Sequence, residues 1–198
     1  MKKIVVATKN KGKIKEMMQA FADLPVELVP LSAFGELPDA VEDGTTFAAN
    51  ACLKADFYRR QTKCACLADD SGLETAVLNG APGIYSARFA GEQATDEENN
   101  AKLLQEIKKK GQETSAAAYR CVLAFVDEDG TCLTAEGSCC GEIRPQAKGQ
   151  NGFGYDSYFY LGDRTLAEYT LAEKDAVSHR GEALRRMAKK LALLLETE

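Results

Sequence analysis

Histidine and long apolar runs are both scarce in the sequence, and each scarcity excludes a class of protein. One histidine among 198 residues leaves too few imidazoles for a histidine-rich zinc site. No stretch approaches the roughly 20 apolar residues that a membrane-spanning helix needs. The first apolar run, 4–8, is too short for a signal peptide, and lysines interrupt it at once. We therefore expect a cytoplasmic protein with no membrane partner.

A basic excess is missing as well. The chain has 25 Lys and Arg residues against 30 Asp and Glu residues, which gives a net charge of -5. Domains that wrap nucleic acid usually carry a basic surplus, so the charge argues against a nucleic-acid partner. Small phosphorylated ligands need only a local group of lysines, amides and a metal ion, and they stay compatible with the charge. The runs Lys108–Lys110 and Arg185–Arg186 are interpreted as solvated helix ends and faces.

The seven cysteines cannot all pair within one chain, and they sit mostly inside apolar runs. Cys64-Ala65-Cys66 and the adjacent Cys139-Cys140 suggest zinc, but neither has the two-residue ligand spacing of a zinc site. We interpret the cysteines as reduced thiols that pack as small hydrophobic residues.

The pattern of segments predicts an α/β fold in one domain over 1–198, either one compact unit or two closely joined lobes. A hydrophobic fraction of 45% allows a sizeable core, and no repeat or linker interrupts the chain. We expect strands at 4–7, 26–29, 64–68, 117–126, 131–143 and 158–160. We expect helices after Asn10, from 45 or 46 to 62, from the capping box Thr95-x-x-Glu98 to 111, and from 177 to 195.

The segment Thr8-Lys9-Asn10-Lys11-Gly12-Lys13 lies between a predicted strand and a predicted helix. Unpaired helix amides, a glycine and three lysines would converge there, which is typical of an anion site. The glycine spacing is not that of a Walker loop, and neither Ser nor Thr follows the last lysine. The alternative interpretation is an ordinary helix start with solvated lysines.

Two further polar groups precede the third predicted strand. Asn50 and Lys54 stand four residues apart and so share one face of a helix, where they could reach a second phosphate or simply form a helix surface. Upstream, Glu42-Asp43-Gly44 places carboxylates in a loop, which suits either a metal ligand or a solvated turn.

Asp69-Asp70-Ser71-Gly72 is predicted to be an acidic turn at the carboxyl end of the strand 64–68. Adjacent carboxylates repel each other unless solvent, a cation or a shared proton relieves them, so the pair indicates Mg²⁺. One carboxylate could then deprotonate the attacking water while the metal stabilises charge on a phosphoryl group. The alternative is a plain Asp-Ser-Gly turn.

The base of a nucleotide would meet two later segments, Phe153-Gly154-Tyr155-Asp156 and Ser178-His179-Arg180. Aromatic faces stack on purines, and Arg180 with nearby amides can donate to a ring oxygen. Donors that face purine position 6 accept a keto oxygen but remain unpaired against the amino group of adenine. His179 has a competing interpretation as the cap or first turn of the last helix.

Together these segments resemble the inosine triphosphate pyrophosphatase family, also described as non-standard purine NTP pyrophosphatases. The resemblance spans nearly the whole chain and rests on seven motifs in order. They are Thr8-x-Asn10-x-x-Lys13, Glu42, Phe47-x-x-Asn50-Ala51-x-x-Lys54-Ala55, Ala68-Asp69-Asp70-Ser71-Gly72-Leu73, Pro82-Gly83-x-Tyr85-Ser86-Ala87-Arg88, Phe153-Gly154-Tyr155-Asp156, and Glu173-Lys174 followed by Ser178-His179-Arg180.

The resemblance implies an elongated mixed β-sheet with flanking helices, two lobes around a central substrate cleft, and a homodimer. It implies hydrolysis of ITP, dITP and XTP to the monophosphate and diphosphate, with Mg²⁺ as cofactor. Asp70 would be catalytic, and Glu42, Asp69 and Asp70 would bind the metal. The substrate contacts implied are Thr8, Lys9, Asn10, Lys11, Gly12, Lys13, Asn50, Lys54, Ser71, Arg88, Phe153, Gly154, Tyr155, Asp156, Lys174, His179 and Arg180.

One position departs from the family pattern. The family continues Tyr-Asp-Pro, whereas this chain has Tyr155-Asp156-Ser157, so the loop behind the base loses a stiffening residue but no contact group. Two other functions are open: a nucleotide sensor that binds without turnover, and a nucleic-acid-binding protein. Retention of Glu42, Asp69 and Asp70 argues against the sensor, because a sensor has no need of catalytic carboxylates.

Overall fold

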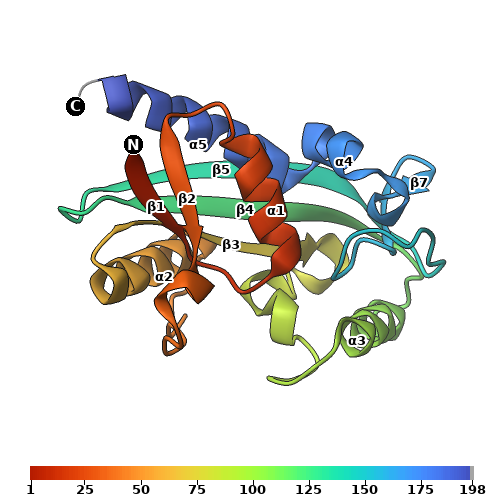
Figure 1. Cartoon of the computed structure of the whole chain (residues 1–198). Coiled ribbons are helices and arrows are strands. Elements are labelled where there is room, and N and C mark those ends of the chain that lie inside the picture. The colour runs from red at the N-terminus through yellow and green to blue at the C-terminus, as the bar shows by residue number, and fades with distance from the viewer. Residues whose placement is uncertain (197–198) are drawn as a thin grey trace. The chain divides into compact units, whose positions relative to one another are not determined.

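A mixed β-sheet with flanking helices forms the fold in the computed structural model, which describes residues 1–196 (Figure 1). The strands are β1 (Lys2–Val6), β2 (Val26–Pro30), β3 (Ala65–Thr75), β4 (Ser115–Val126), β5 (Cys132–Ile143), β6 (Phe159–Leu161) and β7 (Arg164–Thr165). The helices are α1 (Lys11–Ala20), α2 (Phe47–Thr62), α3 (Asp96–Lys109), α4 (Leu171–Val177) and α5 (His179–Glu196). None of these helices is long and apolar enough to cross a membrane.

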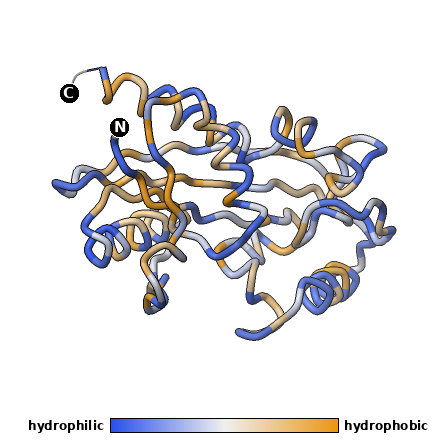
Figure 2. Tube along the Cα trace, viewed as in Figure 1, coloured by the Kyte–Doolittle hydropathy of each residue, from blue (hydrophilic) through white to orange (hydrophobic). Residues whose placement is uncertain are grey.

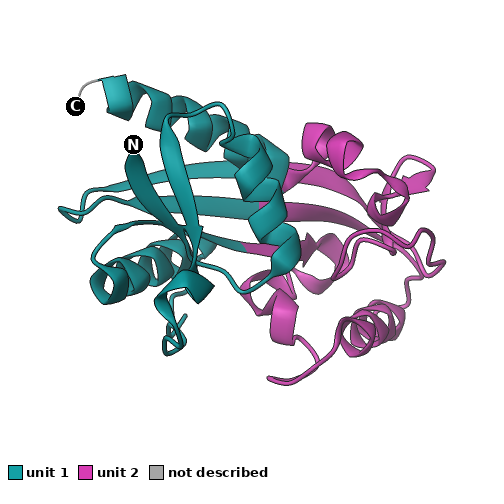
Figure 3. Cartoon of the chain, in the orientation of Figure 1, with its two compact units in different colours: residues 1–70, 121–137, 180–198 teal, residues 71–120, 138–179 magenta. Residues whose placement is uncertain are grey.

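The sheet has seven strands in the order β2-β1-β3-β4-β5-β6-β7. β1 pairs in parallel with β2 and with β3, whereas β6 pairs antiparallel with β5 and with β7. The predicted α/β class and mixed sheet are therefore confirmed. The chain divides into unit 1, residues 1–70, 121–137 and the described part of 180–198, and unit 2, residues 71–120 and 138–179 (Figure 3).

The core of unit 1 follows from strict alternation of side chains along its strands. In β1, Ile4 and Val6 belong to one buried cluster, and Val5 and Ala7 belong to another. β3 and β4 alternate in the same way, so both faces of the sheet are apolar. Helices α1 and α5 cover the first face and α2 covers the second (Figure 1). This two-sided cover fixes the strand ends and helix starts where the candidate site of unit 1 lies.

Unit 2 has its own core, built around one face of α3. Leu103 and Ile107 of α3 are buried with Tyr119 of β4 and Phe159 of β6, and the two rings lie 4.7 Å apart between centroids. The turns of α3 alternate between polar and apolar colours, as expected for a helix with one face on a core (Figure 2). This packing fixes α3 against the core of unit 2.

Several predicted boundaries are confirmed by their capping contacts. Asn10 Oδ1 accepts from the backbone N–H groups of Gly12 and Lys13, at 2.9 and 3.1 Å, and so begins α1. Thr46 caps α2, and Thr95 with Glu98 forms the predicted capping box of α3. The predicted hairpin is present as well, because β4 and β5 are neighbours in the sheet and a turn closed by the Asp127 N–H and the Thr131 carbonyl joins them.

The predicted acidic turn is wrong, because β3 continues through Asp69-Asp70-Ser71-Gly72 to Thr75. Asp, Ser and Gly are all poor strand formers, so the local sequence favours a turn. Pairing in the sheet overrides that preference. The register with β1 ends at Leu67, but the long strand β4 neighbours β3 on its other side. The two aspartates therefore follow the last β1–β3 pair while remaining inside a strand.

The predicted final helix, 177–195, is also wrong in its first turn. Val177 ends the short helix α4, Ser178 is extended with φ -84° and ψ 157°, and His179 begins α5. A capping box that the sequence prediction overlooked, Thr170-x-x-Glu173, begins α4, with Glu173 N donating to Thr170 Oγ1 at 3.3 Å. The two-residue strand β7 was not predicted, since two residues carry no periodicity.

Candidate active site

The lysine-rich segment between β1 and α1 is less open to an anion than predicted. The amides of Gly12 and Lys13 donate to Asn10 Oδ1. The expectation of unpaired amides at these two positions is therefore wrong, and the reason is the Asn10 cap itself. Lys9 Nζ lies 2.5 Å from Asp39 Oδ1, and the Lys11 side chain is exposed. The segment contributes lysine side chains rather than a nest of free amides.

A cavity of about 210 Å³ in unit 1 brings three predicted site segments together. Thr8 and Lys9 line it from the β1–α1 loop, Glu42 lines it from the loop before α2, and Lys54 lines it from α2. Lys54 Nζ lies 3.1 Å from a Glu42 carboxylate oxygen. Burial alone would lower the pKa of Lys54, but the negative charges of Asp69 and Glu42 outweigh it and raise that pKa. Lys54 therefore remains protonated at neutral pH and lines this cavity.

Asn50 connects the loop before α2 to β3. Its Oδ1 accepts from Gly44 N at 2.8 Å, and its Nδ2 donates to Asp70 Oδ2 at 3.0 Å. A side chain at position 44 would not fit, because its Cβ would lie 2.7 Å from Asn50 Oδ1. Both polar ends of the buried amide are thus used inside unit 1. Asn50 fixes the position of Asp70, a role that its helical spacing from Lys54 did not indicate.

Asp70 is a carboxylate whose pKa the fold raises toward neutral pH. Burial is the main reason, and it raises the pKa of Asp70 to about 6. The negative charges of Glu42 and Asp69 act in the same direction, while the Asn50 hydrogen bond and Lys54 oppose it. A carboxylate in such surroundings is a candidate for proton transfer or for binding a cation.

The neighbouring Asp69 behaves in the opposite way. It is fully buried, and its Oδ2 lies 2.8 Å from Lys13 Nζ and 3.5 Å from Arg180 Nε. Burial alone would raise the pKa of Asp69, but Lys13, Arg180 and Lys54 outweigh it and hold that pKa well below its ordinary value. Two adjacent aspartates of one strand therefore have opposite electrostatic surroundings.

Arg180 is held inside unit 1 rather than presented as a donor at a surface. Its side chain is 3% exposed, and one guanidinium nitrogen donates to Glu16 Oε2 at 2.8 Å. With Asp69 as its second carboxylate, Arg180 links α5 to α1 and β3. No sequence motif indicated Glu16, which stands on the buried side of α1 beside Met17.

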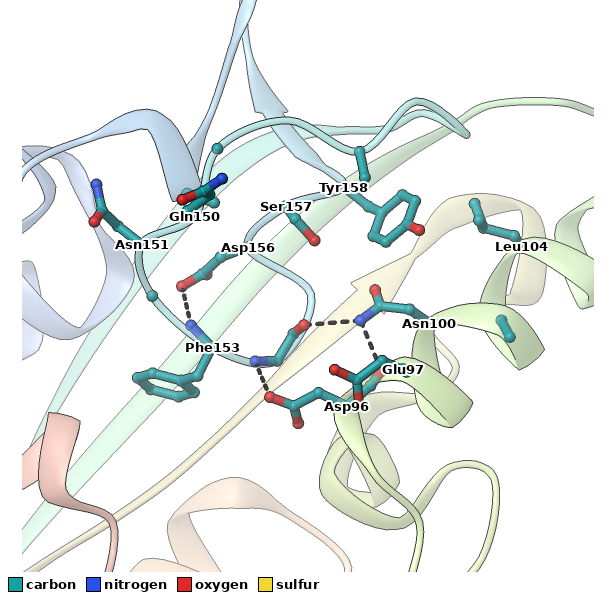
Figure 4. Close-up of a pocket in the computed structure, with 16 residues that line it drawn as sticks. Asp96, Glu97, Asn100, Leu104, Gln150, Asn151, Phe153, Asp156, Ser157 and Tyr158 are labelled. Carbon is teal, nitrogen blue, oxygen red and sulfur yellow. Dashed lines mark hydrogen bonds between the residues drawn. The ribbon is translucent and has the colours of Figure 1, made fainter.

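In unit 2, the segment Phe153-Gly154-Tyr155-Asp156 forms a tight loop around the carboxylate of Asp156. Asp156 Oδ2 accepts from Phe153 N at 3.0 Å (Figure 4). The same oxygen accepts from Lys174 Nζ at 2.7 Å. The ammonium of Lys174 also lies 4.9 Å from the centre of the Phe153 ring. Gly152 is required here, because its φ is +79° and a Cβ would overlap Asp156 Oδ2. The buried ion pair therefore sets the orientation of the aromatic side chain.

The amino end of α3 holds the other side of this loop. Gly154 N donates to Asp96 Oδ2 at 2.6 Å, and Asn100 Nδ2 donates to Gly154 O at 2.8 Å (Figure 4). Both residues line a cavity of about 530 Å³ together with Phe153 and Asp156. The sequence prediction missed Asp96 and Asn100. The signal available in the sequence was Asn100 itself, a polar residue one helical turn before Leu103 and Leu104 on the apolar side of α3.

The other predicted contacts of unit 2 are anchored in different ways. The Tyr155 hydroxyl donates to Ser86 O at 2.7 Å, and His179, the first residue of α5, stacks on Tyr119 with 4.5 Å between ring centroids. Arg88 lies 3.6 Å from Glu92 and close to the Tyr85 ring. Ser71 is half-buried in β3 directly after Asp70, and Ser157, the departure from the family pattern, lines the 530 Å³ cavity.

Each unit thus gathers a different part of the predicted residue set. Unit 1 brings together Thr8, Lys9, Lys13, Glu42, Asn50, Lys54, Asp69, Asp70 and Arg180. Unit 2 brings together Phe153, Gly154, Asp156 and Lys174 and, separately, stacks His179 on Tyr119. Lysines with carboxylates suit phosphates and a cation, and an aromatic ring beside a charged pair suits a purine. The roles of the individual residues stay predictions.

Known proteins resemble this chain over almost its whole length. The model of the Ham1 family matches residues 4–190. The dITP/XTP pyrophosphatase of Desulfotalea psychrophila is 46% identical and covers 91% of this chain and 81% of that protein. The dITP/XTP pyrophosphatase of Bacillus anthracis is 44% identical and covers 96% of each chain.

Solved structures agree with the sequence relatives. A HAM1 protein from Coxiella burnetii is 41% identical and superposes with a TM-score of 0.89 over 96% of this chain and 98% of its own. The Ham1 protein of Staphylococcus aureus is 38% identical and superposes with a TM-score of 0.84 over the same shares. The family model, the sequence relatives and the solved structures agree, so the chain belongs to the Ham1 family.

Proposed function

We propose that the protein hydrolyses the non-standard purine nucleoside triphosphates ITP, dITP and XTP to the monophosphate and diphosphate. Removal of these nucleotides would keep deaminated purines out of DNA and RNA. Relatives at 44–46% identity that are named dITP/XTP pyrophosphatases support the activity. The observation that carries the proposal is Asp70, a carboxylate with a raised pKa that Asn50 holds close to Glu42 and Lys54.

Asp70 is assigned as the general base that deprotonates the attacking water. A carboxylate with a pKa of about 6 is mostly ionised at neutral pH, yet it is a much stronger base than an ordinary aspartate. Asn50 Nδ2, which donates to one Asp70 oxygen, limits the rotation of the carboxylate. Lys54, Lys9 and Thr8 at the 210 Å³ cavity are assigned to the phosphates, because their ammonium and hydroxyl groups can donate to phosphate oxygens.

Glu42 and Asp70 are assigned to a divalent cation, with Mg²⁺ as the proposed ion. Their oxygens suit a hard cation, and each raises the local negative charge around the other. Within residues 1–196 no three His, Cys, Asp or Glu side chains gather as a complete metal site, so substrate and water oxygens would supply the remaining ligands. Bound there, the cation would neutralise charge on the phosphates.

Asp69 is assigned a positioning role instead of a place among the metal ligands. Its carboxylate already meets Lys13 and Arg180, and these two cations keep it ionised. In this position the Asp69 carboxylate holds the Lys13 ammonium in unit 1, the unit to which the phosphates are assigned. The sequence left the division of labour between the two aspartates open, and their opposite surroundings favour this assignment.

The purine is assigned to unit 2, on the ring of Phe153. Lys174, whose ammonium is shared between Asp156 and the ring face, supplies a donor for a keto oxygen. The amino group of adenine would meet this donor with a donor of its own, which disfavours ATP. A homodimer and a cytoplasmic location are further proposals. Light scattering coupled to gel filtration would give twice the chain mass of 21.5 kDa for a dimer.

The experiment that tests the role of Asp70 compares Asp70→Asn with Asp163→Asn. Asp163 is an exposed aspartate in the turn before β7, so it is a matched control for the substitution itself. We expect Asp70→Asn to lower kcat for ITP by about 100-fold or more, the usual scale of a lost general base, with a much smaller change in ITP affinity. Turnover within a few-fold of wild type would remove Asp70 from the reaction.

A further inference from the structure

Two cysteine sulfurs lie next to each other in unit 1, away from the residues assigned to the reaction. Cys52 stands on α2, and Cys132 is the first residue of β5. Their Sγ atoms are 3.2 Å apart, although the residues are 80 positions apart in the sequence. Both are reduced in the structure, and one thiol donates a hydrogen bond to the other. No sequence motif indicates this pair.

The surrounding contacts hold the two sulfurs in place. Arg59, two helical turns after Cys52, donates to the backbone carbonyl of Glu128 at 3.0 Å. Asp56 lies between them on the helix and accepts from Arg59 at 2.8 and 2.9 Å. Cys52, Asp56 and Arg59 therefore share the face of α2 that meets the β4–β5 turn. That turn leads directly into Cys132, so the helix and the strand approach each other through more than the two thiols.

The distance is short enough for a covalent bond to form with a small movement. A disulfide has a sulfur–sulfur distance of about 2.05 Å, so the two Sγ atoms need to approach by roughly 1.2 Å. Cys132 is exposed and Cys52 is half-buried, so a small oxidant can reach the pair from solvent. Cys66 and Cys121, by contrast, are buried, so an oxidant in solvent cannot reach their thiols.

We propose that Cys52 and Cys132 form a redox-modification site, a dithiol that a low-molecular-weight disulfide oxidises to an intramolecular disulfide. One cysteine thiolate attacks the small disulfide, forms a mixed disulfide and releases one small thiol. The second cysteine attacks the protein sulfur of the mixed disulfide, loses its proton and releases the second small thiol. Two protein thiols and one small disulfide thus become one protein disulfide and two small thiols.

The raised thiol pKa of Cys132 is typical of cysteines that form a slow, stabilising disulfide, and not of a fast catalytic thiol. Partial removal of the Cys132 sulfur from water, where it lies against Cys52, and the hydrogen bond between the two thiols raise the pKa of Cys132 above its ordinary value. Since the thiolate is the nucleophile, oxidation is slow at neutral pH and needs sustained exposure to the oxidant. The bond would tie α2, which also carries Asn50 and Lys54, to the start of β5. Both of those residues are two positions from Cys52 and so point to other sides of the helix.

The test incubates the reduced full-length protein with oxidised glutathione and maps the cysteines by mass spectrometry. Cleavage after Lys, Arg and Glu isolates each thiol, because 43–54 contains Cys52 as its one cysteine and 129–136 contains Cys132 as its one cysteine. We expect these two peptides to be joined, with the loss of two hydrogen atoms in the intact mass. We also expect a reversible rise in Tm of about 5–10 °C, because a bond that closes a long loop restricts the unfolded chain.

The controls separate this pair from general thiol oxidation. Cys52→Ser and Cys132→Ser should each abolish the Tm rise, whereas Cys140→Ser, which removes an exposed thiol of unit 2, should preserve it. A lasting glutathione adduct on Cys132, or a link between other cysteines in place of the one between Cys52 and Cys132, would each overturn the proposal. All of these readouts are independent of nucleotide hydrolysis.

Discussion

The substitution Asp69→Asn tests how the buried charges of unit 1 stabilise the protein. The carboxylate is fully buried, with Lys13 Nζ at 2.8 Å and Arg180 Nε at 3.5 Å from its Oδ2 atom. Asparagine preserves the size of the side chain but removes the negative charge. Glu16, at 2.8 Å from Arg180, still pairs with that guanidinium.

The expected loss follows from the burial of each partner. Removing one member of a buried ion pair costs about 3–5 kcal/mol, because the remaining charge is left uncompensated. Arg180 keeps Glu16, and the Lys13 side chain, which is 17% exposed, can turn toward water. We therefore expect the lower end, about 3 kcal/mol. In a chain of this length that corresponds to a fall in Tm of about 6–12 °C.

Thermal unfolding followed by circular dichroism measures the change. The double variant Lys13→Met/Asp69→Asn should regain part of the loss, because it removes the cation that the single variant leaves uncompensated. Asp163→Asn, the exposed control, should shift Tm by about 2 °C or less. An Asp69→Asn protein as stable as wild type, or a double variant whose losses simply add, would refute the ion network as a source of stability.

Three further predictions concern the purine loop, its supporting helix and the other aspartate. Gly152→Ala should raise KM for ITP at least 10-fold in steady-state assays, because the added Cβ would displace the Asp156 carboxylate. Gly162→Ala is the control, since Gly162 has a similar φ of +64° and no atom lies within 4 Å of the added Cβ. Thr95→Ala should lower Tm by about 2–4 °C in thermal unfolding, because the capping box of α3 contributes about 1 kcal/mol. Asp70→Asn should leave Tm unchanged or higher, because burial raises the pKa of Asp70 and so penalises its charged form in the folded state at neutral pH.

The helices and strands that have one simple packing environment were predictable from the sequence. The second helix, α2, shows why: Thr46 caps it, and Ala51 and Ala55 recur on its buried face. The strand β3 was predicted too short, because Asp, Ser and Gly at 69–72 have low strand propensity and the pairing that overrides it is not local. The break at Ser178 was missed for a similar reason, since both α4 and α5 continue one apparent helical pattern.

The candidate residues were predictable, but most of their partners were not. The motifs identified Asp69, Asp70 and Lys13, yet no spacing shows that Lys13 pairs with Asp69 across the 55 residues between them. The same holds for Asp156 with Lys174 and for Asn50 with Asp70. Both aspartates are buried, and the cations beside Asp69 decide the difference. Lys13 and Arg180 lower the pKa of Asp69, whereas burial raises the pKa of Asp70, and these surroundings exist only in the folded chain.

The release of diphosphate from a panel of nucleotides tests the central claim most directly. The wild-type protein is assayed with ITP, XTP, dITP, GTP and ATP, each with Mg²⁺ and with a chelator. We expect diphosphate and monophosphate from ITP, XTP and dITP in the presence of Mg²⁺, much slower release from ATP, and no release with the chelator; GTP, which shares the keto oxygen of ITP, shows how far that oxygen alone decides turnover. Tight binding of ITP without turnover would identify a sensor, and release that is equally fast from ATP and ITP would contradict the proposed purine selectivity.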